Sequence, residues 1–560
     1  MGVIRGLVAL VTLELLTSIG GRSAEASPSH AHAPVDSRAP RVHQTTAGRY
    51  VAELCDDSQP LRCMAMRLLP ERWSPGNPIP DGDPSAGPFA KSAPLAPADI
   101  AAAYDIPPAT AAHGRIVAIL DAPDAYAASD LAAYRAHYNL PALPTCNGMP
   151  TGTTPCFAQV AEDGSASTGE DSGCREASCS DGETSLDMDM VSAACPDCSI
   201  LLVELTKLTT TNVRAAVKTA EALGASAISI SLGAPENTDP TCSGKGCGLH
   251  DPTGYTTPGH LVLAAAGDFG YLLGGDAASS PSYPASAPDV IAVGGTTLFA
   301  KGGGQYDEAV WNDGQFLSAQ DVTTSGCSTE FAMPAWQAAA LAGSGCAKRG
   351  TADIAAAAAF HDSKGETAGI QIYVAGAGGF MLVEGTSASA PLLAGLLTRL
   401  GLTDAMSSDL SWEYTNASAF NDLGGAAYPI DPNGVRTNAS GTSCGILCTA
   451  APGWDGPSGV GTPNGAKLAA LAATSAFDSA DGGAATSATP REDAGAFSAD
   501  SDGTSTAEVP PRGQCACSTP GGSDPVQDVG SILLVCGAIA AGSSRRRLGG
   551  AQERPRHDRW

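Results

Sequence analysis

The string GTSASAP, residues 385–391, places two small hydroxyl residues directly before an apolar run that is typical of a helix. Ser and Thr commonly cap a helix at such a position, because their side chains satisfy free amide groups of the first turn. The same position suits a nucleophile, since the helix dipole and the neighbouring amides stabilise negative charge there. Ser387 is therefore either a capping residue or a nucleophile, and its partners must decide between the two.

Two carboxylates that could activate Ser387 occur in the string DGETSLDMDM, residues 181–190. Glu183 and Asp187 are four residues apart, so a helix would place both on one face, whereas Asp189 would point away. Two adjacent carboxyl groups share a proton and titrate as a pair, which produces a base that works in acid. A pair at this spacing also occurs on solvated helix faces, so its assignment as a base depends on Ser387.

A third carboxylate, Asp268, follows the apolar run HLVLAAAGDFG. An aspartate can donate a hydrogen bond to an oxyanion only when it is protonated, which requires a raised pKa or a low working pH. The simpler alternative is a turn residue before Gly270. Together with Ser387 and the acid pair, Asp268 predicts a serine hydrolase whose activity falls as the pH rises.

Short apolar runs that alternate with helical patterns must position these residues. GRIVAILDAPD, CSILLVEL, SAISISLG, HLVLAAAGDFG and DVIAVGGTTL predict buried strands, and TNVRAAVKTAEALGA predicts a helix. This order predicts an α/β fold with a doubly wound parallel sheet and helices on both faces. In such folds the sites lie at the carboxyl ends of the strands.

The motifs GETSLD, AAAGDFG and EGTSASAP together resemble those of the sedolisin family, the serine-carboxyl peptidases, over about residues 95–473. The resemblance implies a subtilisin-like fold and an endopeptidase or tripeptidyl-peptidase with an acidic optimum. It also implies that Glu183 is the general base and Asp187 its orienting partner. Asp268 would then be the oxyanion donor and Ser387 the nucleophile.

The same resemblance implies a substrate-binding strand and a calcium ion. ISLGAPE, residues 230–236, is similar to the strand that lines the peptide cleft in these folds, where an extended substrate adds edge hydrogen bonds. The implied substrate contacts are Ser231, Leu232 and Gly233. A single Ca²⁺ would be held by carboxylates and main-chain carbonyls, the oxygen ligands that a hard cation prefers. The implied calcium ligands are Asp422, Leu423, Ala451, Gly453 and Asp455.

Two residues beside the predicted site depart from the family pattern. Phe269 stands where a serine is usual after the aspartate, and Glu384 stands where a glycine or serine is usual before GTS. Because of these departures, a catalytically inactive surface binding protein on a peptidase fold remains an alternative function. A second alternative is a subtilisin-type peptidase that uses Asp121 and a histidine, although none of the five histidines in the domain has the usual sequence context. These histidines are His113, His137, His250, His260 and His361.

Composition and the two ends of the chain predict an exported protein. The 560 residues carry a formal net charge of −27, which argues against binding to nucleic acid or to an anionic membrane surface. Arg5, an apolar stretch and Ala24-Glu25-Ala26 indicate a signal peptide.

Near the other end, a cysteine motif, a short apolar run and an arginine cluster resemble the sorting segments of myxobacterial surface proteins; a simple membrane anchor is the alternative. We expect a monomer that acts on polypeptides and meets the cell surface only through this segment. The predicted divisions are a signal peptide (1–26), a short prosegment or arm (27–95), the peptidase domain (96–473), a linker (474–514), a sorting segment (515–547) and a polar tail (548–560).

Cysteine spacing also predicts an oxidising compartment. Of the 17 cysteines, most lie in close pairs, as in an exported chain whose loops are clamped by disulfides. A zinc site at Cys174, Cys179, Cys195 and Cys198 is the alternative. The predicted pairs are Cys55/Cys63, Cys146/Cys156, Cys174/Cys179, Cys195/Cys198, Cys242/Cys247, Cys327/Cys346 and Cys444/Cys448.

Overall fold

The computed structural model describes most of the chain between residues 42 and 481. The described residues are 42–45, 48–55, 60–75, 77, 93–108, 114–167, 169, 181–236, 254–271, 281–313, 321–425, 434–439 and 444–481. The predicted signal peptide, most of the predicted linker, the sorting segment and the polar tail lie outside these residues. Among the helices that can be described, none is both long and apolar enough to cross a membrane.

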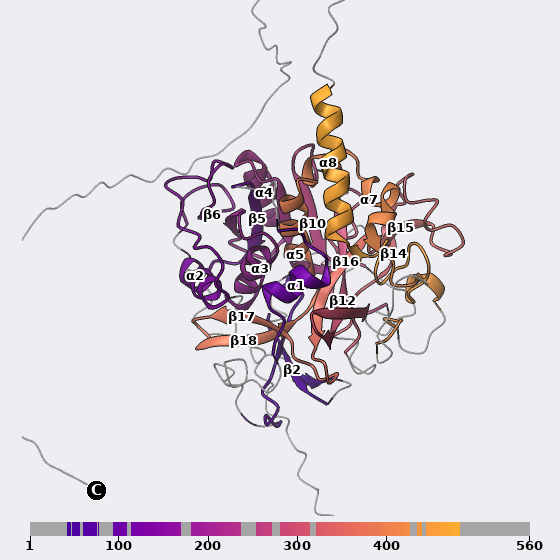
Figure 1. Cartoon of the computed structure of the whole chain (residues 1–560), viewed down its shortest axis with the longest axis horizontal. Helices are drawn as coiled ribbons and strands as arrows, with labels where there is room; N and C mark the ends of the chain where they lie inside the picture. The colour runs from indigo at the N-terminus through magenta and orange to yellow at the C-terminus, as the bar shows by residue number, and fades with distance from the viewer. Residues whose placement is uncertain are drawn as a thin grey trace, which may run out of the picture. The chain divides into compact units, whose positions relative to one another are not determined.

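An eight-stranded sheet forms the centre of the fold (Figure 1). Its order is β13-β12-β10-β8-β5-β7-β6, and β16 pairs with residues 293–299 of β12. All neighbours are parallel except the hairpin of β12 and β13. Most of these strands are short apolar runs that are buried along their whole length, as expected for a sheet covered on both faces. The strands are β5 (Ile116–Asp121), β6 (Phe157–Ala161), β7 (Ser199–Glu204), β8 (Ala227–Ile230), β10 (Leu261–Ala265), β12 (Ile291–Gly302), β13 (Gln305–Val310) and β16 (Ile354–His361).

Helices cover the two faces of this sheet and bury alternate residues of each strand. In β5, Val117 and Ile119 belong to the core cluster that includes α3 (Asp181–Ala194) and α5 (Thr386–Leu400). Ala118 and Leu120 belong instead to the cluster that includes α4 (Thr210–Ala222). This arrangement is the predicted doubly wound α/β fold. It follows from the period of two in a strand, which sends successive side chains to opposite faces.

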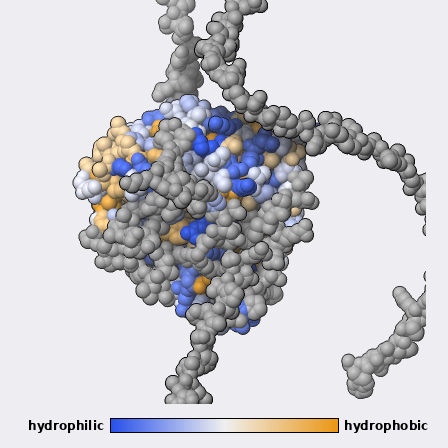
Figure 2. Space-filling model, turned by 180° about the vertical axis from the view of Figure 1, so that it is seen from behind, coloured by the Kyte–Doolittle hydropathy of each residue, from blue (hydrophilic) through white to orange (hydrophobic). Residues whose placement is uncertain are grey.

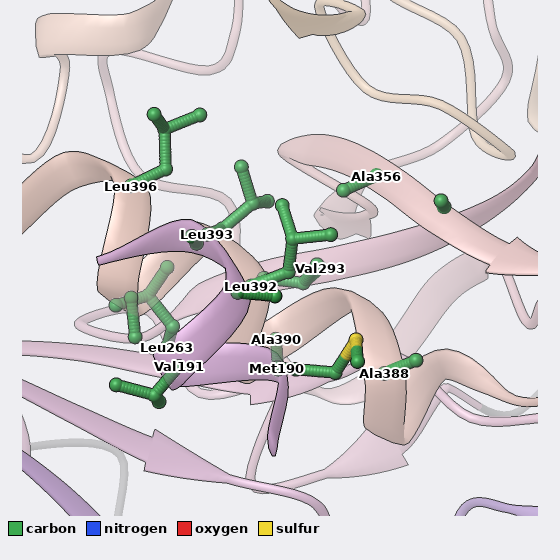
Figure 3. Packing of buried hydrophobic residues seen from close by; sticks show 14 of the residues in the cluster. Met190, Val191, Leu263, Val293, Ala356, Ala388, Ala390, Leu392, Leu393 and Leu396 are labelled. Carbon is green, nitrogen blue, oxygen red and sulfur yellow. The ribbon is translucent and has the colours of Figure 1, made fainter. Parts of the chain in front are cut away.

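Close packing of α3 against α5 brings their N-terminal turns together. Figure 3 shows Val191 of α3 close to leucines of α5 and to Leu263 of β10. A Cβ on Gly395 of α5 would lie 3.1 Å from Ala194 Cβ and 3.2 Å from the Val191 carbonyl oxygen. A larger side chain at position 395 would therefore push the helices apart. Because the contacts run in the same order along both helices, the first turn of α3 faces the first turn of α5.

The segment before the predicted domain contributes strands to two further sheets. One has the antiparallel order β1-β2-β4-β18-β17, and the other has the order β11-β9-β3. Residues 42–69, which we call the N-terminal arm, supply four of these eight strands. The strands are β1 (Val42–Gln44), β2 (Tyr50–Glu53), β3 (Arg62–Cys63), β4 (Met66–Leu68), β9 (Leu232–Pro235), β11 (Ser282–Tyr283), β17 (Ile370–Val374) and β18 (Gly379–Glu384).

Smaller elements and disulfides complete the described structure. Five of the predicted cysteine pairs are bonded, and the pairs Cys174/Cys179 and Cys242/Cys247 lie outside the described residues. Figure 2 shows hydrophilic and hydrophobic residues mixed over the described surface. The remaining elements are α1 (Pro97–Ala103), α2 (Ala127–His137), α6 (Thr403–Ser408), α7 (Trp412–Thr415), α8 (Gly465–Asp481), β14 (Gly326–Ala332), β15 (Lys348–Thr351), β19 (Phe420–Asn421), β20 (Thr462–Pro463) and the 3₁₀ turns Ala417–Ala419 and Gly445–Leu447.

Candidate active site

Ser387 lies in the first turn of α5, directly after a sharp bend. Gly385 precedes the helix with φ +144°, a conformation that disfavours a side chain, and its missing Cβ leaves room for the backbone at Met64 and Ala65. The Ser387 side chain is fully buried. Its hydroxyl donates to the Ser231 carbonyl at 3.3 Å and accepts the Met64 amide at 3.0 Å. Ser387 is thus held at the N-terminal end of the helix, where its N–H has no partner within the helix and donates to the Met64 carbonyl at 3.0 Å.

Glu183 and Asp187 occupy the first two turns of α3, on the face turned to Ser387. Both side chains are fully buried. Burial raises the pKa of Glu183 well above its usual range; the charges of Asp187 and Asp121 raise it further, and the Ser387 hydroxyl lowers it. Neither carboxylate oxygen of Glu183 makes a hydrogen bond of good geometry within the described residues, but the hydroxyl is close enough to favour the charged form. Glu183 is therefore placed beside the serine without a fixed partner.

The Ser231 hydroxyl holds Asp187 in place and also contacts the main chain of Ser387. The Ser231 hydroxyl donates to Asp187 Oδ1 at 2.7 Å and to the Ser387 carbonyl at 3.3 Å. That carbonyl lacks its ordinary helical partner, because the residue four positions later is Pro391, which has no N–H. Burial raises the pKa of Asp187 well above its usual range, and the charge of Asp121 adds to this. Asp187 therefore holds a proton more readily than a free aspartate.

Asp121 joins this carboxylate group from the end of β5. It is buried, and its Oδ1 accepts the Ala122 amide at 2.7 Å. Its charge raises the pKa of both Glu183 and Asp187. The sequence suggests Asp121 only as the acid of a subtilisin-type alternative, although a carboxylate directly after a buried parallel strand was the available signal for its position.

Asp268 follows β10 and contacts the first turn of α5. Its Oδ1 accepts the Thr386 amide at 2.9 Å and the Thr386 hydroxyl at 2.7 Å. Its Oδ2 has no hydrogen-bond partner among the described residues and lies 2.9 Å from where a Cβ of residue 385 would be. Burial raises the pKa of Asp268 well above its usual range, although the hydrogen bonds from Thr386 lower it. A buried, protonated Oδ2 aimed past Gly385 can donate to an oxyanion beside the serine.

The predicted cleft strand lies next to Ser387, and the N-terminal arm pairs with it. Ser231 contacts the serine as described, and Leu232 begins β9. Leu232 pairs with Cys63 and Gly233 with Arg62, in an antiparallel ladder. All three predicted substrate-binding residues therefore face a peptide segment of the same chain.

The two residues that depart from the family pattern are both buried beside this site. Phe269 lies under the Arg62 guanidinium, 4.6 Å from the ring centre. Glu384 ends β18 and pairs with Met66 of β4. Burial raises the pKa of Glu384 well above its usual range, and the charges of Asp313 and Asp321 add to this. The neutral form of Glu384 is thereby favoured.

The described histidines contact groups other than the serine. The His137 ring packs against Phe380, and His260 Nδ1 contacts the Ala225 carbonyl at 2.6 Å. His361 Nε2 lies 3.3 Å from Asp313 Oδ2. His113 and His250 lie outside the described residues. Two of the four residues of the alternative zinc site, Cys195 and Cys198, form a disulfide with each other and so cannot bind zinc.

The predicted calcium ligands come from two adjacent loops. Asp422 Oδ2 accepts the Gly453 amide at 2.7 Å, and Asp455 Oδ2 accepts the Ala451 amide at 3.0 Å. The charge of Asp422 acts on Asp455, so two carboxylates share one small region. No cluster of three or more His, Cys, Asp or Glu side chains suited to a metal occurs in the described ranges. Two carboxylates with the carbonyls of Leu423, Ala451 and Gly453 nevertheless form an all-oxygen set that fits a hard cation.

The chain is similar to known proteins over part of its length. Residues 166–417 match the family model described as the subtilase family. The matched region is similar to the serine peptidases of that family. It contains Glu183, Asp187, Asp268 and Ser387.

Two relatives extend the similarity beyond this region. The chain is 29% identical to kumamolisin of Bacillus sp. (strain MN-32) over 392 residues, which are 66% of this chain and 62% of kumamolisin. It is 34% identical to sedolisin of Pseudomonas sp. (strain 101) over 200 residues, which are 35% of this chain and 31% of that protein. The chain therefore spans less than two thirds of the length of the curated relatives it matches.

A solved structure has the same fold. Pseudomonas sedolisin, a serine-carboxyl proteinase solved with two molecules of pseudo-iodotyrostatin, aligns with a TM-score of 0.51 and 24% identity. The alignment covers 68% of this chain and 99% of that one. The predicted subtilisin-like fold is confirmed.

Proposed function

We propose that this chain is an exported serine-carboxyl peptidase that acts in acid and hydrolyses peptide bonds through an acyl-enzyme on Ser387. The observation that carries the proposal is the convergence of Glu183, Asp187 and Asp268 on one buried serine. Glu183 and Asp187 come from α3, and Asp268 comes from the segment after β10. Burial of carboxyl oxygens without hydrogen-bond partners among the described residues, namely both oxygens of Glu183 and Oδ2 of Asp187 and Asp268, costs free energy, which a catalytic role would account for.

Each residue has a distinct role in the proposed reaction. Glu183 takes the hydroxyl proton as Ser387 Oγ attacks the peptide carbonyl carbon, and Asp187 holds its own proton and orients Glu183. The oxyanion accepts hydrogen bonds from the Ser387 N–H and from protonated Asp268. The C–N bond then breaks, and the leaving amine receives the proton from Glu183. Water, deprotonated by Glu183, hydrolyses the ester and restores the serine.

The test is hydrolysis of a denatured protein from about pH 3 to 8 by the wild type and its variants. Ser387→Ala and Glu183→Gln should each lose at least about 10⁴-fold in kcat/KM. The matched control is Asp189→Asn, a fully buried carboxylate of the same helix that accepts the Tyr373 amide instead of facing the serine. The control should stay within about threefold of the wild type. Activity that survives Glu183→Gln but is lost in a His361→Ala variant would favour the histidine alternative instead.

We also propose one bound Ca²⁺ at Asp422 and Asp455, with the carbonyls of Leu423, Ala451 and Gly453. The cation would neutralise two nearby carboxylates and join the two loops. Addition of Ca²⁺ after chelation should raise the Tm of the wild type, and Asp422→Asn should abolish this response. Asp163→Asn, at an exposed loop position, is the control and should respond like the wild type. An equal response in both variants would contradict the assignment.

Export and surface attachment remain proposals that rest on the predicted signal peptide, 1–26, and sorting segment, 515–547. The five disulfides among the described residues support an oxidising compartment. Truncation after residue 514 should move the protein from the cell-associated fraction to the medium. Retention in the cytoplasm of the intact chain would contradict the proposal.

A further inference from the structure

The segment of the arm next to Ser387 shows the path that the cleft offers to an extended peptide. Residues 62–63 pair antiparallel with residues 232–233 of β9, and the Met64 amide donates to the Ser231 carbonyl at 3.2 Å. A peptide that adds a strand to a sheet edge is held by its main chain, so its path does not depend on its side chains. Other extended peptides that bind β9 in this register should therefore place their side chains against the same residues.

Positions along this path can be counted from the bond beside the nucleophile. The Met64 carbonyl accepts the Ser387 N–H at 3.0 Å, so the peptide bond beside the serine is Met64–Ala65. Counting back from that bond, Met64 is at the first position and Arg62 is at the third. Successive side chains of a strand point to opposite faces, so the side chains at the first and third positions share one face.

Phe269 receives the side chain at the third position. The Arg62 guanidinium lies over its ring, 4.6 Å from the ring centre. This distance is within the range of a cation–π contact, in which the face of the ring attracts the positive charge. The Phe269 side chain is buried, with 8% of the residue exposed, so its ring is largely shielded from water. The Arg62 charge also acts on the neighbouring Asp268: burial raises the pKa of that carboxyl, and the charge lowers it. Phe269 thus presents a surface suited to a cation beside the proposed oxyanion donor.

Contacts that do not involve the arm fix the main chain at Phe269. The Phe269 amide donates to the Thr324 hydroxyl at 2.9 Å, and the next amide, of Gly270, donates to the Val322 carbonyl at 2.9 Å. Gly270 has φ +69°, and a Cβ there would lie 2.8 Å from the Asn438 carbonyl oxygen. A ring on a main chain held in this way binds a ligand at a small cost in conformational entropy.

The first and fourth positions favour different chemistry from the third. Leu61, at the fourth position, is fully buried in the apolar cluster that includes Leu208, and its amide donates to the Leu208 carbonyl at 2.9 Å. Met64, at the first position, is also fully buried, and its Cε lies 2.9 Å from where a Cβ of Gly233 would be. A charged side chain at either of these positions would lose its hydration, which costs free energy. A cation therefore fits the third position and is disfavoured at the other two.

We infer that Phe269 is a specificity-determining residue that selects peptides with arginine at the third position before the cleaved bond. This inference rests on the proposed peptidase activity and names its substrate class: peptides with a cation at the third position and apolar side chains at the first and fourth. Phe269 stands where the family usually has a serine, and a serine offers no ring to a cation. The preference is therefore expected of this chain and is not implied by its resemblance to the family.

The test is kcat/KM of the purified full-length chain at about pH 4 on two quenched fluorescent peptides that differ only at the third position. Both have leucine at the fourth position and methionine at the first, and the third is either arginine or citrulline, which has a similar shape but no charge. The wild type should prefer the arginine peptide by about 2- to 30-fold, the range of a cation–π contact. Because both peptides are measured on one preparation, this ratio does not depend on the fraction of active molecules.

Variants at position 269 separate the effect of the ring from that of apolar size. Phe269→Leu removes the ring, so its ratio of arginine to citrulline should fall to about 1. The matched variant Phe269→Tyr keeps the ring and should keep the ratio of the wild type. Equal hydrolysis of both peptides by the wild type, or an unchanged preference in Phe269→Leu, would overturn the inference and leave the proposed peptidase standing. A wild type that hydrolyses neither peptide nor a denatured protein would refute the peptidase and the inference together.

Discussion

Asp268→Asn should keep a hydrogen-bond donor at the proposed oxyanion site but remove the dependence of that donor on pH. Oδ1 of Asp268 already accepts two hydrogen bonds from Thr386, whereas Oδ2 has no partner among the described residues and lies beside the Met64 carbonyl. An asparagine in the same orientation keeps the acceptor and places an NH₂ group at the Oδ2 position. The variant therefore donates a hydrogen bond at every pH, while the wild type donates only when it is protonated.

The magnitude follows from the loss of a single donor. Burial raises the pKa of Asp268 well above its usual value, so the donor is present in acid and is lost as the pH rises through that pKa. Removing one oxyanion donor costs about 2.7–4 kcal/mol, or about 10²–10³ in kcat. At pH 4, Asp268→Ala should lose about that factor, and Asp268→Asn should stay within about tenfold of the wild type. At higher pH the ratio of the asparagine variant to the wild type should increase towards about 10².

The assay is kcat of the purified enzymes on a quenched fluorescent peptide from pH 3 to 8, with Tm measured at each pH as a control for folding. Two results would refute the reasoning. If wild type and Asp268→Asn lose activity at the same pH, the proton that matters belongs to Glu183 or Asp187. If Asp268→Ala keeps full activity at pH 4, Asp268 is not a donor at all.

Three further outcomes are expected. Leu393→Ala, in the core cluster between α5 and the sheet, should lower the free energy of unfolding by about 2–5 kcal/mol in urea titrations. Burial raises the pKa of Asp130 to about 6, so the stability it contributes is complete in acid and is lost as the pH rises through 6. The free energy of unfolding of the wild type should therefore fall as the pH rises from 3.8 to about 6, and this fall should be smaller in Asp130→Asn. Phe269→Ser removes the ring under Arg62 and should lower the free energy of unfolding in urea titrations by about 0.5–2 kcal/mol, the usual range of a cation–π contact.

The sequence carries enough local information to predict the central sheet and the roles suggested for the carboxyls. Buried parallel strands are short apolar runs, so β5 and β10 could be recognised without any partner. Glu183 and Asp187 share a helix face by spacing alone. Their approach to Ser387 could not be derived from spacing, because it depends on the close packing of α3 against α5 at Gly395.

The strands of the arm could not be predicted from local pattern. Residues 62–68 are too few to show a clear alternation, and their partners in β9 and β18 lie far along the chain. Such short strands gain their stability from cross-strand pairing, which no local window contains. Asp121 is ambiguous for a related reason. Its place at a strand end fits two mechanisms, and only the folded structure shows that its charge acts on Glu183 and Asp187.

The two departures from the family pattern argue for an occupied cleft instead of a lost activity. A substitution that disabled the proposed catalysis would be expected at Ser387, Glu183 or Asp268, and these residues match the family motifs. Phe269 and Glu384 instead contact Arg62 and Met66, one on each side of the bond beside Ser387. Phe269 offers a ring to a cation, and the buried Glu384 extends the sheet that receives β4. Both residues therefore contact the docked arm, and the proposed catalytic residues are unchanged.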